Sequence, residues 1–242
     1  ARGLEEVGLY SAAFRFLMLA MVVVDSFVNS LFPIISNYYR HAAEGSRDQF
    51  EVACKKGLQL LLVLTVPVAL ALSLLADQII LLVYGEKYIG AIPALRILIW
   101  VVVPYAISQI FAYALVASNN QRYDFFVNAV SMVCNMMLNW ILIQQFGYIG
   151  AAWSAALAIL IYVAVQVPFV LHRVLTFDVK RLLFGGLKVV IATVLMAIFI
   201  LFFPQIKIWF LVPLAFVLYL LTLIAAKTFS RNDWLLATRL LK

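Results

Sequence analysis

Seven apolar segments, each about 20 residues long, run through this chain with short polar connections between them. A helix needs about 20 apolar residues to cross the hydrocarbon core of a bilayer. Strands of a membrane barrel would instead alternate over about ten residues. The sequence therefore predicts an all-α polytopic membrane protein with about seven transmembrane helices. We place them at 10–35, 57–75 (with an amphipathic continuation to 85), 92–117, 125–143, 149–171, 182–203 and 209–226.

The composition excludes an ordinary soluble domain. Hydrophobic residues make up 66% of the 242 residues and charged residues 12%, whereas soluble domains are about half apolar and about a quarter charged. A net charge of +7 is compatible with binding to nucleic acid, but the sequence has no basic cluster with interleaved aromatic residues. We therefore expect a lipid bilayer as a partner and no nucleic acid.

The Lys and Arg residues gather on one side of the predicted spans, which sets an orientation. Connections on the cytoplasmic side of membrane proteins are enriched in these residues. Four lie on the other side, namely Arg2, Lys87, Arg96 and Lys207. Twelve of the eighteen belong to the rich side: Arg40, Arg47, Lys55, Lys56, Arg122, Arg173, Lys180, Arg181, Lys227, Arg231, Arg239 and Lys242. The chain is thus predicted to start outside and to end in the cytoplasm.

Each end of the chain leads to a separate prediction. The chain opens on Ala1 rather than Met, and its first residues look like a loop that enters a helix within a longer protein. We therefore expect a fragment or a processed chain. Residues 230–242 predict a short amphipathic helix at the membrane surface, with Trp234 as its anchor.

Two charged residues of the first span are candidates for a cavity. Asp25 lies near the middle of the span, where a charge costs about 2.5–3.5 kcal/mol and should face the bundle interior or water. Asn29 follows one turn later on the same face. Asp25 either makes an interhelical hydrogen bond or binds a proton or cation. Arg15, ten residues earlier, either extends its side chain to the outer surface or contacts a phosphate.

A polar stripe follows one face of the fourth span. Its members lie three or four residues apart: Asn128, Ser131, Asn135 and Asn139. These side chains either hold helices together or line a hydrated path. We assign Asn135 to helix packing and leave Asn128 and Asn139 open. Gln109 and Tyr113 form a smaller pair of this kind on the third span. Gly150 belongs to a small-residue face of the fifth span that predicts close helix packing.

No enzyme, metal or cofactor signature is present in the sequence. There is no glycine-rich phosphate loop, no HExxH and no Ser/His/Asp arrangement. The two histidines and two cysteines are isolated and lack metal-ligand spacing. We therefore expect neither catalytic residues nor a cofactor nor a metal site.

Several stretches resemble polysaccharide and O-antigen flippases of the multidrug, oligosaccharidyl-lipid and polysaccharide exporter superfamily. They read, in chain order, VGLYSAAFRF with SFVNSLFPIIS, then LLVYGEKYIGAIPALRIL, LVASNNQRYDFFVNAV and NMMLNWILIQQFGYIGAAWSAALA. The resemblance covers nearly the whole chain and implies helices eight to fourteen of a two-lobed transporter. Residues 1–175 would form the C-terminal lobe, and residues 176–242 would form two additional helices and a short tail. The N-terminal lobe would be missing from this chain.

The resemblance implies a function. A polyprenyl-pyrophosphate-linked oligosaccharide, such as an O-antigen, exopolysaccharide or capsule repeat unit, would cross the bacterial inner membrane by alternating access. The N-terminus would be periplasmic and the C-terminus cytoplasmic. The implied cavity candidates are Arg15, Asp25, Asn29, Gln109, Tyr113, Asn128, Asn135 and Asn139. One alternative is a multidrug or cation antiporter of the same superfamily, and another is a membrane glycosyltransferase or polymerase component.

Overall fold

The computed structural model describes residues 3–41, 47–175, 179–203 and 208–226. The interfacial helix predicted for 230–242 lies outside the described residues, as do Arg2, Lys207, Lys227, Arg231, Arg239 and Lys242.

Nearly all of the described residues are helical, so the all-α prediction is confirmed. Six helical segments are long and apolar enough to cross a membrane, and the described apolar part of a seventh helix runs from Gly186 to Phe202. Several helices begin one to three turns before the predicted span, because helical hydrogen bonding continues past the apolar core. The elements are α1 (Leu4–Arg40), α2 (Arg47–Leu74), α3 (Ala76–Tyr84), η2 (Glu86–Tyr88), α4 (Ala91–Leu98), η3 (Ile99–Val101), α5 (Val102–Ala117), α6 (Gln121–Phe146), α7 (Tyr148–Arg173), α8 (Val179–Phe202) and α9 (Ile208–Ala225).

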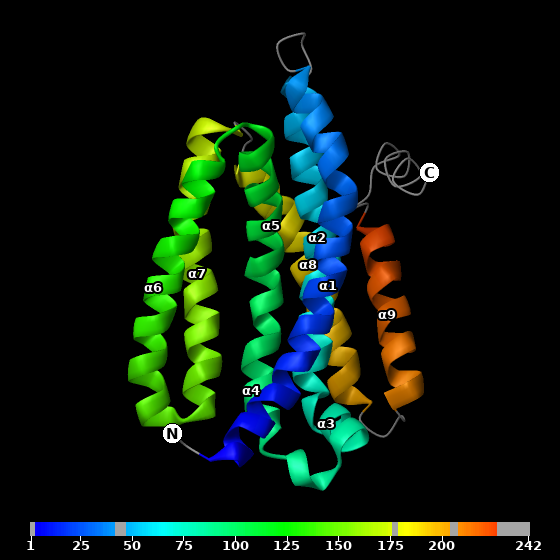
Figure 1. Ribbon diagram of the computed structural model, residues 1–242. Coiled ribbons are helices and arrows are strands. Elements are labelled where there is room, and N and C mark those ends of the chain that lie inside the picture. The colour runs from blue at the N-terminus through cyan, green and yellow to red at the C-terminus, as the bar shows by residue number, and fades with distance from the viewer. Residues whose placement is uncertain (1–2, 42–46, 176–178, 204–207, 227–242) are drawn as a thin grey trace.

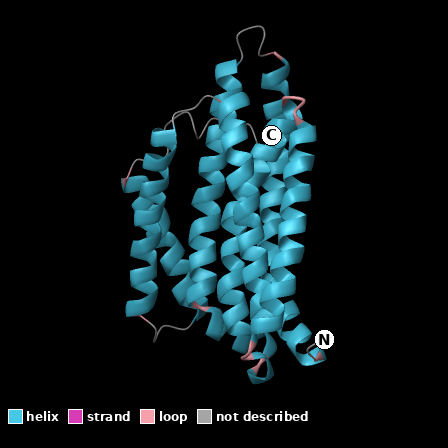
Figure 2. Ribbon diagram, turned by 90° about the vertical axis from the view of Figure 1, so that its left-hand side faces the viewer, coloured by secondary structure: helices cyan, strands magenta, loops and turns pink. Residues whose placement is uncertain are grey.

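The helices run up and down the bundle, and their connections lie at its two ends (Figures 1 and 2). The end of α1, the turn between α5 and α6 and the end of α7 lie at one end in Figure 1. The segment from α3 to α4 and the turn between α6 and α7 lie at the other. This arrangement places the described cations of the basic-rich side at one end of the bundle and η2, which carries Lys87, at the opposite end.

The third predicted span is built from three consecutive pieces, α4, η3 and α5. The 3₁₀ turn of η3 covers Ile99–Val101 and lies just before Pro104. Proline has no backbone N–H to donate to the carbonyl four residues earlier, which here belongs to Trp100. The tighter turn therefore lies where the regular α-helical ladder loses a donor.

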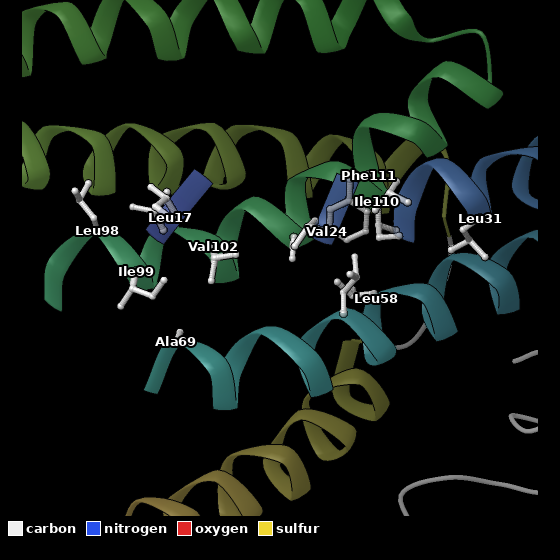
Figure 3. Close-up of a cluster of buried hydrophobic side chains, with 14 of the residues drawn as sticks. Leu17, Val24, Leu31, Leu58, Ala69, Leu98, Ile99, Val102, Ile110 and Phe111 are labelled. Carbon is white, nitrogen blue, oxygen red and sulfur yellow. The ribbon is translucent and has the colours of Figure 1, made fainter. Parts of the chain in front are cut away.

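The main hydrophobic core lies between α1, α2, α4 and α5. Figure 3 shows Val24 of α1, Leu58 of α2 and Ile110 of α5 approaching one another. Each of these side chains is buried. A Cβ atom on Gly57 would lie 2.4 Å from Leu31 Cδ2, so the absence of a side chain there lets α1 and α2 approach closely. This core holds α1 and α5 in a fixed register.

The α6–α7 hairpin stands beside this core (Figure 1). α6 packs chiefly on α7, and only 6% of its most apolar 18-residue window is buried. α7 in turn packs on α5 and α4. The hairpin is thus attached to the rest of the bundle mainly through one of its two helices.

A second hydrophobic cluster joins α8 and α9 to the outer side of α2 and α3. Tyr219 of α9 is buried and donates its hydroxyl to the carbonyl of Val63 at 2.7 Å. A pocket of about 330 Å³ lies between these helices, with an almost wholly apolar lining that includes Leu72, Met196 and Phe216.

Candidate functional site

The carboxylate of Asp25 is held by two side chains of α5. Tyr105 donates its hydroxyl to Asp25 Oδ1 at 2.7 Å, and Gln109 Nε2 donates to the same oxygen at 2.9 Å. Gln109 Nε2 also lies 3.1 Å from the Tyr105 hydroxyl. Tyr105 and Gln109 are one turn apart on α5 and therefore share a helix face. Two neutral donors thus stabilise a carboxylate in the middle of a membrane-spanning helix.

A second hydrogen-bonded pair of side chains lies one turn along the same two helices. Tyr113 donates its hydroxyl to Asn29 Oδ1, and its ring packs edge-on against Phe32 with the centroids 5.0 Å apart. Gln109 and Tyr113, which the sequence paired on one face of the third span, thus contact Asp25 and Asn29 of the first. We call this set of five polar side chains, Asp25, Asn29, Tyr105, Gln109 and Tyr113, the α1–α5 ladder.

The α1–α5 ladder leaves polar atoms open. Asp25 is half-buried and Asn29 is exposed. Among the described residues, Asp25 Oδ2 and Asn29 Nδ2 make no hydrogen bond. A carboxylate oxygen and an amide nitrogen are therefore available on one face of α1. They can bind water, a ligand hydroxyl or a cation.

Arg15 lies on that same exposed face of α1. At 100° per residue, Ser26, Asn29 and Ser30 all lie within about 60° of it around the helix axis. These four side chains are exposed, and Arg15 forms no ion pair or hydrogen bond with any described residue. The serine hydroxyls donate back to carbonyls of their own helix. This face of a membrane-spanning helix thus carries polar groups that no described element covers, together with the exposed apolar residues Leu19 and Val22.

A second carboxylate, Asp124 of α6, has a similar set of partners on α7. Tyr162 donates its hydroxyl to Asp124 Oδ1 at 2.6 Å, and Gln166 Nε2 donates to it at 3.1 Å. Gln166 Nε2 lies 3.1 Å from the Tyr162 hydroxyl. Asn128, one turn after Asp124, donates to Asp124 Oδ2 at 3.2 Å. We call these four residues the α6–α7 cluster.

The α6–α7 cluster satisfies both carboxylate oxygens of Asp124 and reaches a third helix, while Asn128 is exposed and its Oδ1 makes no hydrogen bond among the described residues. Tyr162 is 7% exposed and Gln166 is 0% exposed. Gln166 Nε2 also donates to the carbonyl of Ser108 on α5 at 3.3 Å. Both oxygens of Asp124 accept hydrogen bonds, so little of this charge is left for a ligand. Gln166 Oε1 is buried and has no hydrogen-bond partner in the described structure.

The rest of the polar stripe on α6 holds the hairpin together. Asn139 donates to Asn135 Oδ1 at 2.7 Å, and Ser154 of α7 donates to Asn139 Oδ1 at 2.6 Å. Asn135 Nδ2 lies 3.3 Å from the carbonyl of Ser154, and Ser131 donates to that of Ala158 at 2.9 Å. Asn128, Asn135 and Asn139 are therefore all engaged between α6 and α7.

Gly150 sets the distance between these two helices. A Cβ atom at this position would lie 2.1 Å from the backbone oxygen of Leu142 on α6. Gly147 joins α6 to α7 with a φ of 62°, a conformation that favours glycine. The small-residue face expected on the fifth span thus includes this close approach, which brings Ser154 within reach of Asn139.

Tyr105, Asp124, Tyr162 and Gln166 were not selected from the sequence, although a repeat marks them. DSFVN at 25–29 and DFFVN at 124–128 share Asp, Phe, Val and Asn, and YAISQ at 105–109 and YVAVQ at 162–166 share Tyr and Gln. The Val of each Asp motif, Val28 and Val127, is buried. Each Tyr-x-x-x-Gln pair places a hydroxyl and an amide one turn apart, and both reach one carboxylate oxygen.

Potential metal ligands are dispersed. Within the described parts of the chain, no three His, Cys, Asp or Glu side chains come together as a metal site would require. Asp77 and Arg96, on α3 and α4, form an exposed ion pair at 2.8 Å.

Comparison with known proteins relates the chain to flippases. Residues 7–221 match the family model described as lipid II flippase MurJ. A solved structure of lipid II flippase MurJ in an inward closed conformation superposes with a TM-score of 0.72 and 20% identity. The match covers 90% of this chain and 46% of that one, and it shows a common fold.

One curated relative comes from Haloferax volcanii. It is described as a probable low-salt glycan biosynthesis flippase, Agl15, and is 26% identical over 154 residues. The match covers 64% of this chain and 32% of the relative, so the chain spans about a third of that relative's length. The flippase resemblance expected from the sequence is confirmed at this level, while the matching family model is that of lipid II flippases.

Proposed function

We propose, because this chain belongs to the lipid II flippase MurJ family, that it forms one lobe of a transporter that moves a lipid-linked saccharide between membrane leaflets. A second lobe, in keeping with the chain's 46% coverage of the solved MurJ chain, would complete a central cavity. The substrate we propose is a polyprenyl-pyrophosphate-linked oligosaccharide, such as an O-antigen, exopolysaccharide or capsule repeat unit. Transport would proceed by alternating access.

The exposed polar face of α1 is the observation that carries this proposal. Arg15, Ser26, Asn29 and Ser30 project from a membrane-spanning helix on a side that no described element covers. Polar groups that face hydrocarbon are costly, so such a face belongs against water or against protein. A face that lines a hydrated cavity would give sugars and pyrophosphate a route across the membrane.

The lobe offers groups that suit the phosphates and the sugar hydroxyls of the substrate. The guanidinium of Arg15 can bind phosphate oxygens with two parallel hydrogen bonds. Asp25 Oδ2 and Asn29 Nδ2 offer an acceptor and a donor to sugar hydroxyls, with Tyr105, Gln109 and Tyr113 holding them in place. The polyprenyl chain would remain in lipid beside the cavity. Asn128, Asn135 and Asn139 would support the cavity wall, because their amides are engaged in the hairpin.

We also propose an orientation and a division of the chain. The end of the bundle that carries Arg40 and Arg47 would face the cytoplasm of a bacterial cell, and the end that carries Lys87 would face the periplasm. Residues 1–175 would form the lobe itself, and 176–242 two additional helices and a tail. The separate hydrophobic cluster of α8 and α9 supports this division. An impermeant thiol reagent should label a cysteine at Lys87, and not one at Arg47, in intact cells.

Substitution of Arg15 in the complete transporter tests the function. Export of surface glycan, at matched membrane abundance, should fall in the order Arg, Lys, Gln. Gln removes a charge-assisted contact of about 1.5–3 kcal/mol, which is about a ten- to a hundredfold loss of affinity. Lys keeps the charge but lacks the planar fork of Arg and should be intermediate. Equal export by all three proteins would remove Arg15 from the substrate site.

A second candidate function rests on Asp25 Oδ2, which has no hydrogen-bond partner among the described residues. A proton or cation antiporter of the same superfamily would use such a carboxylate for coupling. The test measures efflux of cationic drugs in cells where no lipid-linked saccharide is moved. Efflux that is abolished by Asp25→Asn would favour the antiporter over the flippase.

A further inference from the structure

Gln166 is the member of the α6–α7 cluster whose hydrogen bonds to described residues reach α5. Its Nε2 lies 3.3 Å from the backbone carbonyl of Ser108. The same nitrogen lies 3.1 Å from Asp124 Oδ1 and 3.1 Å from the Tyr162 hydroxyl. These two oxygens are only 2.6 Å apart, so they lie in a similar direction from the amide and can share one of its two hydrogens. The second hydrogen is left for Ser108.

The orientation of this amide is fixed, although it leaves one atom unpaired. Gln166 is fully buried, and its Oε1 has no hydrogen-bond partner in the described structure. Turning the amide over would place Oε1 against the oxygens of Asp124 and Ser108, which would repel it. The observed orientation is therefore the favoured one, and it holds the nitrogen toward α5.

The carbonyl that Gln166 contacts belongs to the turn of α5 that carries both partners of Asp25. Ser108 is 2% exposed, and its hydroxyl donates to the carbonyl of Tyr105 at 2.7 Å. Tyr105 and Gln109, which begin and end this turn, donate to Asp25 Oδ1 at 2.7 Å and 2.9 Å. Gln166 of α7 and Asp25 of α1 are thus connected through a single turn of α5.

This turn needs support from outside its own helix. It follows the 3₁₀ turn of η3 and begins directly after Pro104. Because Pro104 cannot donate to the carbonyl of Trp100, the ladder of backbone hydrogen bonds is interrupted just before Tyr105. Helices bend most readily at such interruptions. A buried hydrogen bond from a neighbouring helix can therefore fix the position of the turn.

We propose that Gln166 is a positioning residue for the carboxylate of Asp25, an inference that rests on the function proposed above. Through the Ser108 carbonyl, Gln166 holds the turn 105–109 where Tyr105 and Gln109 both reach Asp25 Oδ1. Asp25 Oδ2 is thereby left open for a sugar hydroxyl. Without the Gln166 amide the turn shifts, the two donors no longer converge on one oxygen, and the carboxylate rotates. Gln166 thus acts on substrate binding without contacting the substrate.

The other members of the two networks lack such a connection. Gln109 reaches Asp25 and Tyr105 but makes no hydrogen bond to a third helix among the described residues. Tyr162 and Asn128 form their hydrogen bonds to described residues within α6 and α7. A substitution at Gln166 should therefore affect transport as well as stability, in contrast to substitutions elsewhere in the α6–α7 cluster.

The carbon-13 resonance of the Asp25 carboxyl group tests the positioning without any substrate. The complete transporter would carry aspartate labelled at this carbon and would be reconstituted in lipid nanodiscs. The signal of Asp25 is the one that Asp25→Asn removes. Gln166→Met keeps the length of the side chain and removes the amide, so it should shift this signal in the same direction as Tyr105→Phe, which removes a donor directly. Gln166→Asn, whose amide is one methylene too short to reach α5, should do the same.

Asn139→Ala is the matched control for these variants. It removes hydrogen bonds of the α6–α7 hairpin, and the described partners of Asn139 do not belong to α5. The Asp25 signal should stay in place in this variant, even where the midpoint of thermal unfolding falls. The proposal is overturned if neither Gln166 variant moves the signal. It is also overturned if Asn139→Ala moves the signal as far, since any loosening of the hairpin would then suffice.

Export of surface glycan connects the positioning to transport. At matched membrane abundance, Gln166→Met should lower export per molecule by about two- to tenfold, the equivalent of one ordinary hydrogen bond. Added to Asp25→Asn, it should cause no further loss, because both changes act on the same carboxylate. A further loss in the double variant would overturn the positioning role.

The two proposals can fail separately. If Arg15→Gln lowers export while the Gln166 variants leave the Asp25 signal unmoved, the proposed function stands and the positioning role is overturned. If the Gln166 variants shift the signal while Arg15→Gln and Asp25→Asn leave export unchanged, the positioning of Asp25 stands and the proposed function is overturned.

Discussion

The α1–α5 ladder and the α6–α7 cluster use the same residues in different surroundings. In each, a Tyr hydroxyl and a Gln amide one turn apart bind one oxygen of an Asp, and an Asn follows that Asp by one turn. Asp124 has its second oxygen satisfied by Asn128, and Gln166 and Tyr162 are buried. Asp25 leaves its second oxygen open, and Tyr105 and Gln109 are only half-buried. Asn29 and Asn128 are both exposed and both aspartates are half-buried, so these features do not distinguish the two networks.

We infer from this difference that the motif alone does not determine the role. A closed set of hydrogen bonds between two packed helices contributes to stability and specificity. The α1–α5 ladder also joins two packed helices, but it leaves Asp25 Oδ2 and Asn29 Nδ2 without a partner among the described residues, so they can bind a ligand. We therefore expect substitutions in the α6–α7 cluster to act mainly on stability, and substitutions in the α1–α5 ladder to act mainly on transport.

The largest loss of stability is expected from Gly150→Ala, because this substitution disrupts the close packing between α6 and α7. The added Cβ would meet the backbone of Leu142 at 2.1 Å, and backbone cannot yield as the end of a side chain can. Overpacking of this kind costs about 1–3 kcal/mol or more, so the midpoint of thermal unfolding in detergent should fall clearly. Gly8→Ala on α1 is the matched control, because nothing lies within 4 Å of its added Cβ. Equal midpoints for the two variants would refute the close approach.

Removing the two tyrosine hydroxyls compares the networks directly. Tyr162→Phe should destabilise by up to about 1–2 kcal/mol, the upper range for interhelical hydrogen bonds in membranes, and Tyr105→Phe by about 0.6 kcal/mol or less. The reason is that the Tyr162 hydroxyl contacts Asp124, Asn128 and Gln166, whereas the half-buried ladder admits water to replace a lost donor. Unfolding midpoints of both variants check the order. The reverse order would mean that the ladder is the structural network.

A smaller effect, on transport instead of stability, is expected at Asn29. Asn29→Ala should lower glycan export by about two- to tenfold at matched membrane abundance, the equivalent of one ordinary hydrogen bond to the substrate. Asn135→Ala is the control, since the hydrogen bonds of Asn135 to described residues all lie within the hairpin. It should lower abundance and leave export per molecule unchanged. A loss of export per molecule at Asn135 alone would reverse the assignment of the two regions.

Much of the fold could be predicted from the sequence because membrane helices are long, continuous and apolar. Each predicted span corresponds to a helix or to a consecutive run of helices, including the third span with its 3₁₀ turn before Pro104. The ends were predicted less well, since helices such as α2 extend into polar residues before the apolar run. The helical register within a span also followed from spacing, which placed Asp25 with Asn29 and Gln109 with Tyr113.

The pairing of those faces could not be predicted in the same way. Asp25 and Gln109 are 84 residues apart, and their contact depends on how α1 and α5 slide and rotate against each other in the packed core. Asp124 lies beside Arg122 in the first turn of its helix, where an acidic residue is ordinary. Gln166 is a single polar residue in an apolar run. The repeated Asp-x-Phe-Val-Asn and Tyr-x-x-x-Gln patterns are the sequence signal that could have linked these residues, and no prediction from the sequence rested on it.

Water access along α1 tests most directly whether the exposed face of this helix lines a hydrated cavity. Single cysteines at Ser26 and Ser30, in a protein lacking Cys54 and Cys134, would be treated with a hydrophilic thiol reagent in the assembled transporter. Two controls differ in their environment: Ser154→Cys is buried in the hairpin, and Met136→Cys is 70% exposed on the outer face of α6, where we expect lipid. If the face lines a hydrated cavity, labelling will be rapid at Ser26 and Ser30 and almost absent at Ser154 and Met136. Labelling at Ser26 and Ser30 as slow as at Met136 would mean that the face lies against lipid.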